Sequence, residues 1–169
     1  MARIRRQKKI EKTKFTFKPT ARFLRGDPRY DNLVVTKVVN QLMHDGKKSV
    51  AERVLYGALD AIQKRLKDKD PLEVLMGAIN NVKPQLEVRS KRVGGATYQV
   101  PMEVNQKRQQ TLAVRVLILN ARARKGKPMT ERLADELIDA YNGQGASITW
   151  RENTHKMAEA NKLFAHFAW

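Results

Sequence analysis

The sequence has no cysteine among its 169 residues, which excludes disulfide frameworks, thiolate zinc sites and cysteine nucleophiles. Long apolar runs are missing too, since none approaches the roughly 20 residues that a membrane-spanning helix needs. The first residues, MARIRRQKKIEK, lack the apolar core of a signal peptide. We therefore expect a soluble, cytoplasmic chain that is neither exported nor bound to a membrane.

Motifs of catalysis and cofactor binding are also missing. The chain has no phosphate-cradling glycine loop, no nucleophile elbow and no HExxH motif. Glu152-x-x-His155 has the spacing of half a carboxylate di-iron site, but such a site needs a second copy and two more glutamates. We predict no catalytic residue, no metal site and no cofactor.

Acidic residues are scarce, because 17 Asp and Glu stand against 34 Lys and Arg, a formal charge of +17. The excess lies in two blocks. Residues 1–25 hold ten basic residues and one acidic residue, and residues 83–125 hold ten basic and two acidic, whereas the rest is close to neutral. Charge that served only solubility would be spread more evenly, so this distribution indicates a polyanionic partner such as RNA or DNA.

The first basic block, residues 1–25, has scattered apolar residues without helical or strand periodicity. Such a segment buries too little surface to order itself. We interpret it as a disordered basic arm that becomes ordered on nucleic acid, with a plain solvated tail as the alternative. Residues 26–169 are predicted to form one domain with a core.

Apolar residues at helical spacing predict that this domain is mainly α, a six-helix, bundle-like body. The expected helices span about 31–46, 49–66, 70–84, 108–125, 128–141 and 149–169. Ser49 with Glu52, and Thr149 with Glu152, are predicted capping boxes, and Asp70 is a predicted N-cap. Short connections predict that the first three helices pack antiparallel.

Residues 86–104, LEVRSKRVGGATYQVPMEV, predict a protruding two-stranded β-hairpin with a basic tip. A two-residue Gly-Gly loop would set Leu86 against Glu103. An odd-length loop or a bulge would set Val88 against an apolar partner such as Val100. We expect the odd-length loop, with the hairpin base packed on the helices and the tip projecting.

The helix expected over 108–125 repeats its basic residues as well as its apolar ones. Arg108, Arg115, Arg122 and Lys125 fall on one face, spread along the axis over about a Debye length or more. This length suits a phosphate backbone better than one small anion. A plain solvated face is the alternative, but the glutamate partners at i+4 that such faces usually carry are absent.

Three segments resemble the signature segments of one family: VNQLMHDGKKS at 39–49, KRVGGATYQVPMEV at 91–104 and HKMAEANKLFAHFAW at 155–169. The chain resembles small-subunit ribosomal protein seven of the bacterial and organellar type, from about Asp27 to Trp169. The resemblance implies a primary binder of ribosomal RNA (rRNA) that nucleates the head of the small subunit. It further implies a monomer within the ribosome, beside other small-subunit proteins and near exit-site tRNA and the mRNA path.

The residues expected to meet RNA follow from this resemblance and from the basic helix face. Those expected to bind rRNA are Arg3, Arg5, Arg6, Lys8, Lys9, Lys12, Lys14, Lys47, Lys48, Arg89, Lys91, Arg92, Lys107, Arg108, Arg115, Arg122 and Lys125. Those expected to lie near exit-site tRNA and mRNA are Gly94, Gly95, Tyr98, His166 and Trp169.

Two other classes of protein would use the same charges. An architectural DNA-binding protein with a basic β-ribbon arm usually carries an apolar or proline wedge at the tip, whereas this tip is Gly-Gly-Ala-Thr with Pro101 set well back. An enzyme acting on RNA would need an acid–base pair in the basic block, where Glu87 and Glu103 are the only acidic residues. We retain the DNA-binding protein as the alternative to the ribosomal interpretation.

Overall fold

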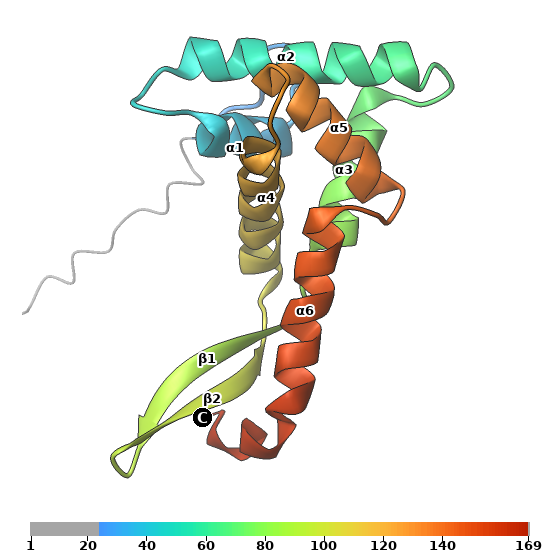
Figure 1. Ribbon diagram of the computed structural model, residues 1–169. Coiled ribbons are helices and arrows are strands. Elements are labelled where there is room, and N and C mark those ends of the chain that lie inside the picture. Colours follow the sequence, from blue (N-terminus) through green and yellow to red (C-terminus); the bar gives the residue numbers. More distant parts are fainter. Residues whose placement is uncertain (1–23, 169) are drawn as a thin grey trace, which may run out of the picture. The chain divides into compact units, whose positions relative to one another are not determined.

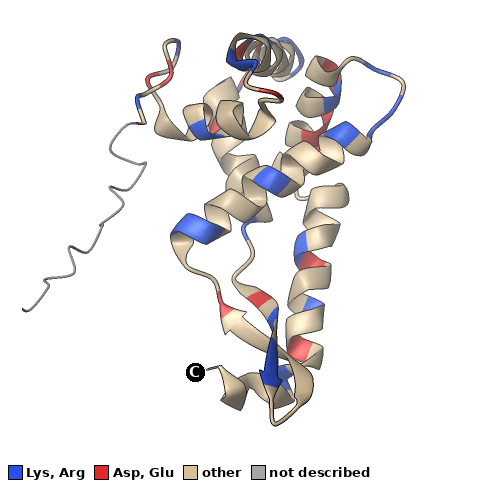
Figure 2. Ribbon diagram, turned by 90° about the vertical axis from the view of Figure 1, so that its left-hand side faces the viewer, with Lys and Arg blue, Asp and Glu red and all other residues tan. Residues whose placement is uncertain are grey.

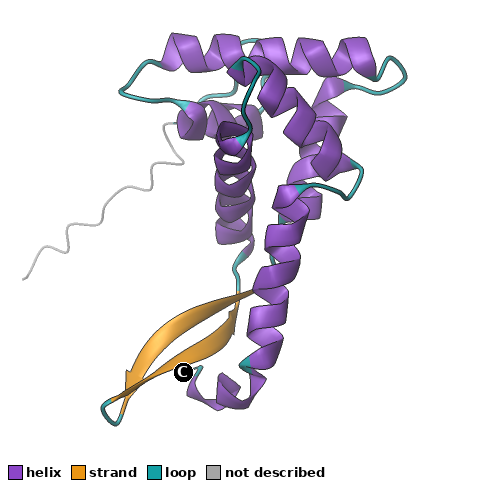
Figure 3. Ribbon diagram, in the orientation of Figure 1, coloured by secondary structure: helices purple, strands orange, loops and turns teal. Residues whose placement is uncertain are grey.

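The computed structural model describes residues 24–168, and Figure 1 follows the chain through them. The chain divides into two units, residues 1–36 and 37–169, with the boundary inside the first helix. The elements are α1 (Leu33–Leu42), α2 (Lys48–Arg65), α3 (Pro71–Val82), β1 (Leu86–Val93), β2 (Ala96–Glu103), α4 (Gln106–Ala123), α5 (Met129–Tyr141), α6 (Ala146–Ala160) and the 3₁₀ helix η2 (Lys162–Phe167). The prediction of a mainly helical chain with one two-stranded hairpin is confirmed (Figure 3). No helix within residues 24–168 is both long and apolar enough to cross a membrane.

In the first unit, a turn leads into α1. The carboxylate of Asp27 accepts the backbone N–H of Arg29 at 3.1 Å and that of Tyr30 at 3.3 Å. The side chain of Asn32 then accepts the backbone N–H of Val34 at 2.7 Å, which satisfies one of the free donors at the start of the helix. Short polar side chains therefore set the beginning of α1.

The core of the second unit is built around α5, which packs on α2, α3 and α4. Leu133 and Leu137 of α5 are at most 2% exposed. They meet Leu75 of α3 and Leu117 of α4 around a void of only about 10 Å³. Such close packing makes each buried leucine worth about 1.5–3 kcal/mol of folding free energy.

The arrangement of α2 and α3 differs from the predicted antiparallel packing. Figures 1 and 2 show α2 lying across the end of α3 rather than alongside it. Both helices approach α5 closely. A Cβ added to Gly57 of α2 would lie 2.8 Å from Thr130, and one added to Gly77 of α3 would lie 2.7 Å from the Tyr141 ring. The two glycines let opposite ends of α5 touch α2 and α3.

Two helices begin earlier than their predicted capping boxes. α2 begins at Lys48 and α6 at Ala146, so Ser49 and Thr149 lie inside helices, and neither helix has a side-chain cap from its own N-cap residue. The prediction for α3 is confirmed, because the Asp70 side chain accepts the N–H of Leu72 at 3.1 Å.

A buried carboxylate of α5 supplies a cap for α6. Glu136 is 1% exposed and accepts the N–H and the hydroxyl of Ser147 at 3.3 and 2.6 Å. It also accepts Nε of Arg124 at 2.8 Å, and Arg124 pairs with Asp139 at 2.5 Å. Burial disfavours the charged guanidinium, but the hydrogen bonds with Asp139 and Glu136 outweigh it and raise the pKa of Arg124. This network joins the C-terminal end of α4 and the start of α6 to α5.

Asp135 connects α5 to α2 by an ion pair with Arg65, and it also pairs at 3.0 Å with Lys127 in the loop before α5. Burial opposes ionisation of this carboxyl group, but the hydrogen bonds from Arg65 and Lys127 outweigh it and lower its pKa below the usual range of an aspartate. A lowered folded-state pKa stabilises the protein above the unfolded pKa, and this contribution is lost as the pH falls through the folded pKa.

We expect Asp135→Asn to lower the free energy of unfolding at pH 7 by about 1 kcal/mol, a modest value because the cationic partners are partly exposed. The difference from the wild type should shrink below about pH 4. Urea unfolding at pH 7 and pH 3 measures the loss of unfolding free energy and its dependence on pH. Asp68→Asn is the matched control, because Asp68 is exposed and has no ion pair among residues 24–168. Equal destabilisation by Asp135→Asn at both pH values would contradict the expected linkage.

The register of the hairpin contradicts the predicted odd-length loop. Val88 pairs with Pro101, and Gly94 and Gly95 form a two-residue turn. Their φ angles are 58° and 91°, and only glycine accepts two such positive values at little cost, as a tight hairpin turn requires. The geometry of the turn therefore sets the register, and the pairing of apolar residues across the strands does not. As a result, Glu87 lies on the buried face of the hairpin.

The buried face of the hairpin packs on the C-terminal segment. The Tyr98 ring lies 5.3 Å from Phe164 and 5.2 Å from Phe167 of η2, measured between ring centroids. Val100, on the same face, is fully buried, whereas Val88 on the opposite face is half-buried. The middle of the hairpin is thus anchored, and residues 92–97 are largely exposed around the turn.

Candidate nucleic-acid interface

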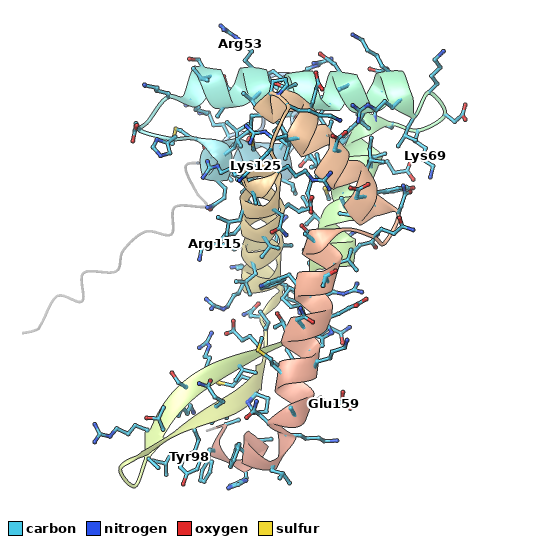
Figure 4. All side chains as sticks on the ribbon, in the orientation of Figure 1. Arg53, Lys69, Tyr98, Arg115, Lys125 and Glu159 are labelled. Atoms are coloured by element: carbon cyan, nitrogen blue, oxygen red, sulfur yellow. The ribbon has the colours of Figure 1, made fainter. Side chains whose placement is uncertain are left out.

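The basic residues of α4 lie on its exposed side. Figure 2 shows Lys and Arg recurring along the side of this helix that faces the viewer. The side chains of Arg115 and Lys125 are exposed and form no hydrogen bond or ion pair with any residue that the structure describes, and Figure 4 shows Arg115 extending away from the helix. Arg122 is also exposed, although it donates to the carbonyl of Leu42 at 3.0 Å. Unpaired charge on this face is available to phosphates.

The loop before α2 adds charge near the end of α4. Lys47 and Arg122, far apart in the sequence, line the same shallow cavity of about 150 Å³. Lys47 has no ion pair among the described residues, whereas Lys48 lies 3.7 Å from Glu52 of its own helix. The predicted sites on α4 and in this loop therefore come together in space.

At the base of the hairpin, Glu87 binds two of the predicted arginines. Nε of Arg89 donates to Oε1 at 2.5 Å, and Nε of Arg108 donates to Oε1 at 3.0 Å and to Oε2 at 2.7 Å. The Glu87 side chain is 11% exposed, against 50% for Arg89 and 51% for Arg108. Burial opposes ionisation of Glu87, but the hydrogen bonds from Arg108 and Arg89 outweigh it and lower its pKa. The carboxylate therefore links β1 to α4, while the side chains of both arginines remain about half exposed to solvent.

The sequence gives little indication of this role. Glu87 is one of two acidic residues in a block with ten basic ones. Only its separation of two residues from Arg89, which places both on one strand face, indicates an ion pair. The contact with Arg108 depends on how the hairpin meets α4, which the sequence pattern does not specify.

The remaining basic residues of the block have different surroundings. Arg92 near the tip and Lys107 at the start of α4 are exposed and have no ion pair among the described residues. Lys91 is half-buried and donates to the carbonyl of Phe167 at 3.1 Å. Lys91 therefore helps to anchor the hairpin, and Arg92 and Lys107 remain open to solvent.

The residues predicted to lie near tRNA differ in their exposure and contacts. Gly94 and Gly95 are exposed, and an added Cβ on either would meet nothing within 4 Å. Tyr98 is half-buried against η2, so it is not a free tip residue. His166 is exposed, with Nδ1 at 2.8 Å from the carbonyl of Leu163.

Several predicted residues lie outside residues 24–168. Trp169 is one of them. The others are the arm residues Arg3, Arg5, Arg6, Lys8, Lys9, Lys12 and Lys14.

A groove of about 750 Å³ runs between the hairpin base and the segment formed by α6 and η2. Its lining includes apolar Leu86, Pro101 and Ala158, together with His155. Nε2 of His155 accepts the N–H of Gln85 at 3.0 Å, so this histidine links α6 to the residue that precedes β1. Among residues 24–168, no three His, Asp or Glu side chains are grouped so that they could hold a metal ion.

A mainly helical body that carries a cationic hairpin and unpaired basic residues along one helix defines a class of small basic proteins typical of nucleic-acid binding. Comparison with known proteins then identifies the family. Residues 6–162 match the family model described as ribosomal protein S7p/S5e. The chain therefore belongs to the ribosomal protein S7p/S5e family.

Individual relatives agree with this assignment. The chain is 54% identical to the small ribosomal subunit protein uS7 of Thermotoga neapolitana over 143 residues, which cover 85% of this chain and 92% of that protein. It is 56% identical to uS7 of Rhodopirellula baltica over 145 residues, with the same coverage. It is 59% identical to uS7 of Magnetococcus marinus over 143 residues, 85% of this chain and 91% of that protein.

Proposed function

We propose that the protein is a structural constituent of the small ribosomal subunit, where it binds rRNA and lies among neighbouring ribosomal proteins. The observation that carries this proposal is the family match over residues 6–162, together with relatives named small ribosomal subunit protein uS7. The unpaired cations on α4 and in the loop before α2 support it, because phosphate contacts supply most of the affinity of such proteins.

The proposed rRNA surface combines the arm with the basic residues around α4 and the hairpin. Its described members are Lys47, Lys48, Arg89, Lys91, Arg92, Lys107, Arg108, Arg115, Arg122 and Lys125. Lys91 and Arg108 also hold the hairpin in place, so they serve the surface partly by shaping it. The exposed cations of α4 would follow a phosphate backbone.

The finer assignment concerns where the protein acts. In this proposal it binds the head domain of the rRNA directly, nucleates head assembly, and works as a monomer within a cytoplasmic ribosome. The exposed tip of the hairpin, with Gly94 and Gly95, faces exit-site tRNA and the mRNA path. The exposed position of both glycines supports this orientation.

Binding of a head-domain rRNA transcript and of duplex DNA, compared at 150 mM salt, tests the proposed function. We expect the RNA to bind at least about a hundredfold more tightly, because specific sites exceed non-specific ones by large factors. A filter-binding titration measures both affinities. Equal affinities would favour an architectural DNA-binding protein instead.

Replacing residues 92–97 with a short neutral turn tests the role of the tip. Lys91, Tyr98 and Val100 remain, so the anchored part of the hairpin should stay folded. We expect the affinity for rRNA to fall by about threefold or less, since only Arg92 is removed. In assembled subunits, retention of exit-site tRNA should fall.

The matched variant for this experiment is Tyr98→Ala, which removes the ring contacts with η2 but keeps the tip. Head assembly and tRNA occupancy are measured separately for both variants. A tip replacement that blocks rRNA binding and leaves tRNA occupancy unchanged would contradict the assigned roles.

A further inference from the structure

The two arginines at the base of the hairpin meet at one carboxylate oxygen. Arg89 comes from β1 and Arg108 from the first turn of α4, and both donate Nε to Oε1 of Glu87. Two guanidinium groups with no carboxylate between them would repel each other and separate in water. Glu87 therefore keeps together two cations that come from different elements.

Each arginine keeps donors free. A guanidinium has five N–H donors. Arg108 directs only Nε at Glu87, and Arg89 directs Nε and one terminal nitrogen. The other donors have no partner among the residues that the structure describes, and about half of each side chain is exposed. The Glu87 side chain is only 11% exposed, so most of the solvent-exposed surface of this cluster belongs to the two arginines.

We propose that Glu87 is a positioning residue that holds Arg89 and Arg108 as one preformed binding unit for a backbone phosphate of RNA. This inference rests on the proposed function, and it adds a defined site within the basic surface. Arginine binds phosphate with paired, directed N–H donors, so a fixed orientation of the guanidinium matters more than charge alone. Because the two side chains are already held in place in the free protein, binding costs less side-chain entropy.

The proposal predicts an effect of Glu87→Gln on RNA affinity that is opposite to the one expected from net charge alone. Removing an acidic residue from a protein that binds a polyanion should strengthen binding. Glu103 provides the matched case, because it belongs to the same basic block but is exposed and has no ion pair among the described residues. Glu87→Gln and Glu103→Gln change the net charge equally. The proposal requires opposite effects on affinity.

The experiment measures the affinity of the full-length variants for a head-domain rRNA transcript at one salt concentration. We expect Glu103→Gln to bind as tightly as the wild type or up to about threefold more tightly. Glu87→Gln should bind about tenfold more weakly, since two long side chains lose their fixed positions. Tighter binding by Glu87→Gln would overturn the proposal and leave the proposed function intact.

A second measurement separates positioning from a general loss of structure. In a background with both Arg89→Ala and Arg108→Ala, Glu87→Gln should no longer weaken binding. In the free protein, the ¹⁵N order parameters of the two Nε–H groups should fall in Glu87→Gln and stay high in Glu103→Gln. Unchanged order parameters, or equal weakening in both backgrounds, would overturn the positioning role. Failure of the wild type to bind the transcript would instead overturn the proposed function.

Discussion

The affinity of the protein for head-domain rRNA is expected to fall roughly a thousandfold or more between 50 and 200 mM salt. The physical reason is counterion release, because neutralising about six to ten phosphates frees a comparable number of bound cations. The chain offers enough charge for this, with a formal charge of +17 concentrated in two blocks. Titrations at four or more salt concentrations give the slope.

Substitution of single basic residues shows which of them contribute to the slope of log affinity against log salt concentration. Arg115→Ala and Lys125→Ala should each reduce its magnitude by about one, since both side chains are exposed and unpaired among residues 24–168. Lys67→Ala is the control, because Lys67 lies in the loop after α2, beside Lys69, which Figure 4 shows on the opposite side from Arg115. Deleting residues 1–25 should flatten the slope most. A flat salt response of the wild type would contradict the electrostatic account.

Val100→Asp is expected to destabilise the folded protein by about 3 kcal/mol or more, because it places a charge at a fully buried apolar position. Val100 is fully buried on the strand face that carries Tyr98. A loss of this size is a large fraction of the stability of a typical domain. Urea unfolding followed by circular dichroism measures it.

Two further substitutions serve as controls for Val100→Asp. Thr97→Asp introduces the same charge on the same strand near the exposed tip and should leave stability nearly unchanged. Val88→Asp should have an intermediate effect, because Val88 is half-buried on the other strand face. Equal stability of the Val100→Asp and Thr97→Asp variants would show that the hairpin base contributes little to folding.

Elements with strong local signals were predictable from the sequence. The cap at Asp70 followed by Pro71 marks the start of α3, and apolar spacing marks α5 to within a residue. The exposure of Arg115 also follows from helical spacing, since it lies opposite the apolar positions of α4. In each of these cases the deciding interactions lie within a few residues of each other along the chain.

Features decided by distant partners were not predictable. The cap of α6 comes from Glu136 on another helix, so the local capping-box pattern at Thr149 predicts a start three residues late. The hairpin register depended on Gly94 and Gly95 tolerating positive φ, while matching of apolar residues favoured another pairing. The burial of Glu87 could not be predicted, because its partner Arg108 belongs to a different element.

The central place of α5 has a consequence for how the protein is made. α2 and α3 pack mainly on α5, which ends at Tyr141, whereas α3 is complete at Val82. At a synthesis rate of about 5–20 residues per second, roughly 3–12 s separate these two points. During that interval the apolar faces of α2 and α3 lack their main covering, while the second basic block is being synthesised. The nascent chain thus exposes apolar surface and strong positive charge at the same time, and this combination favours early binding of chaperones or RNA.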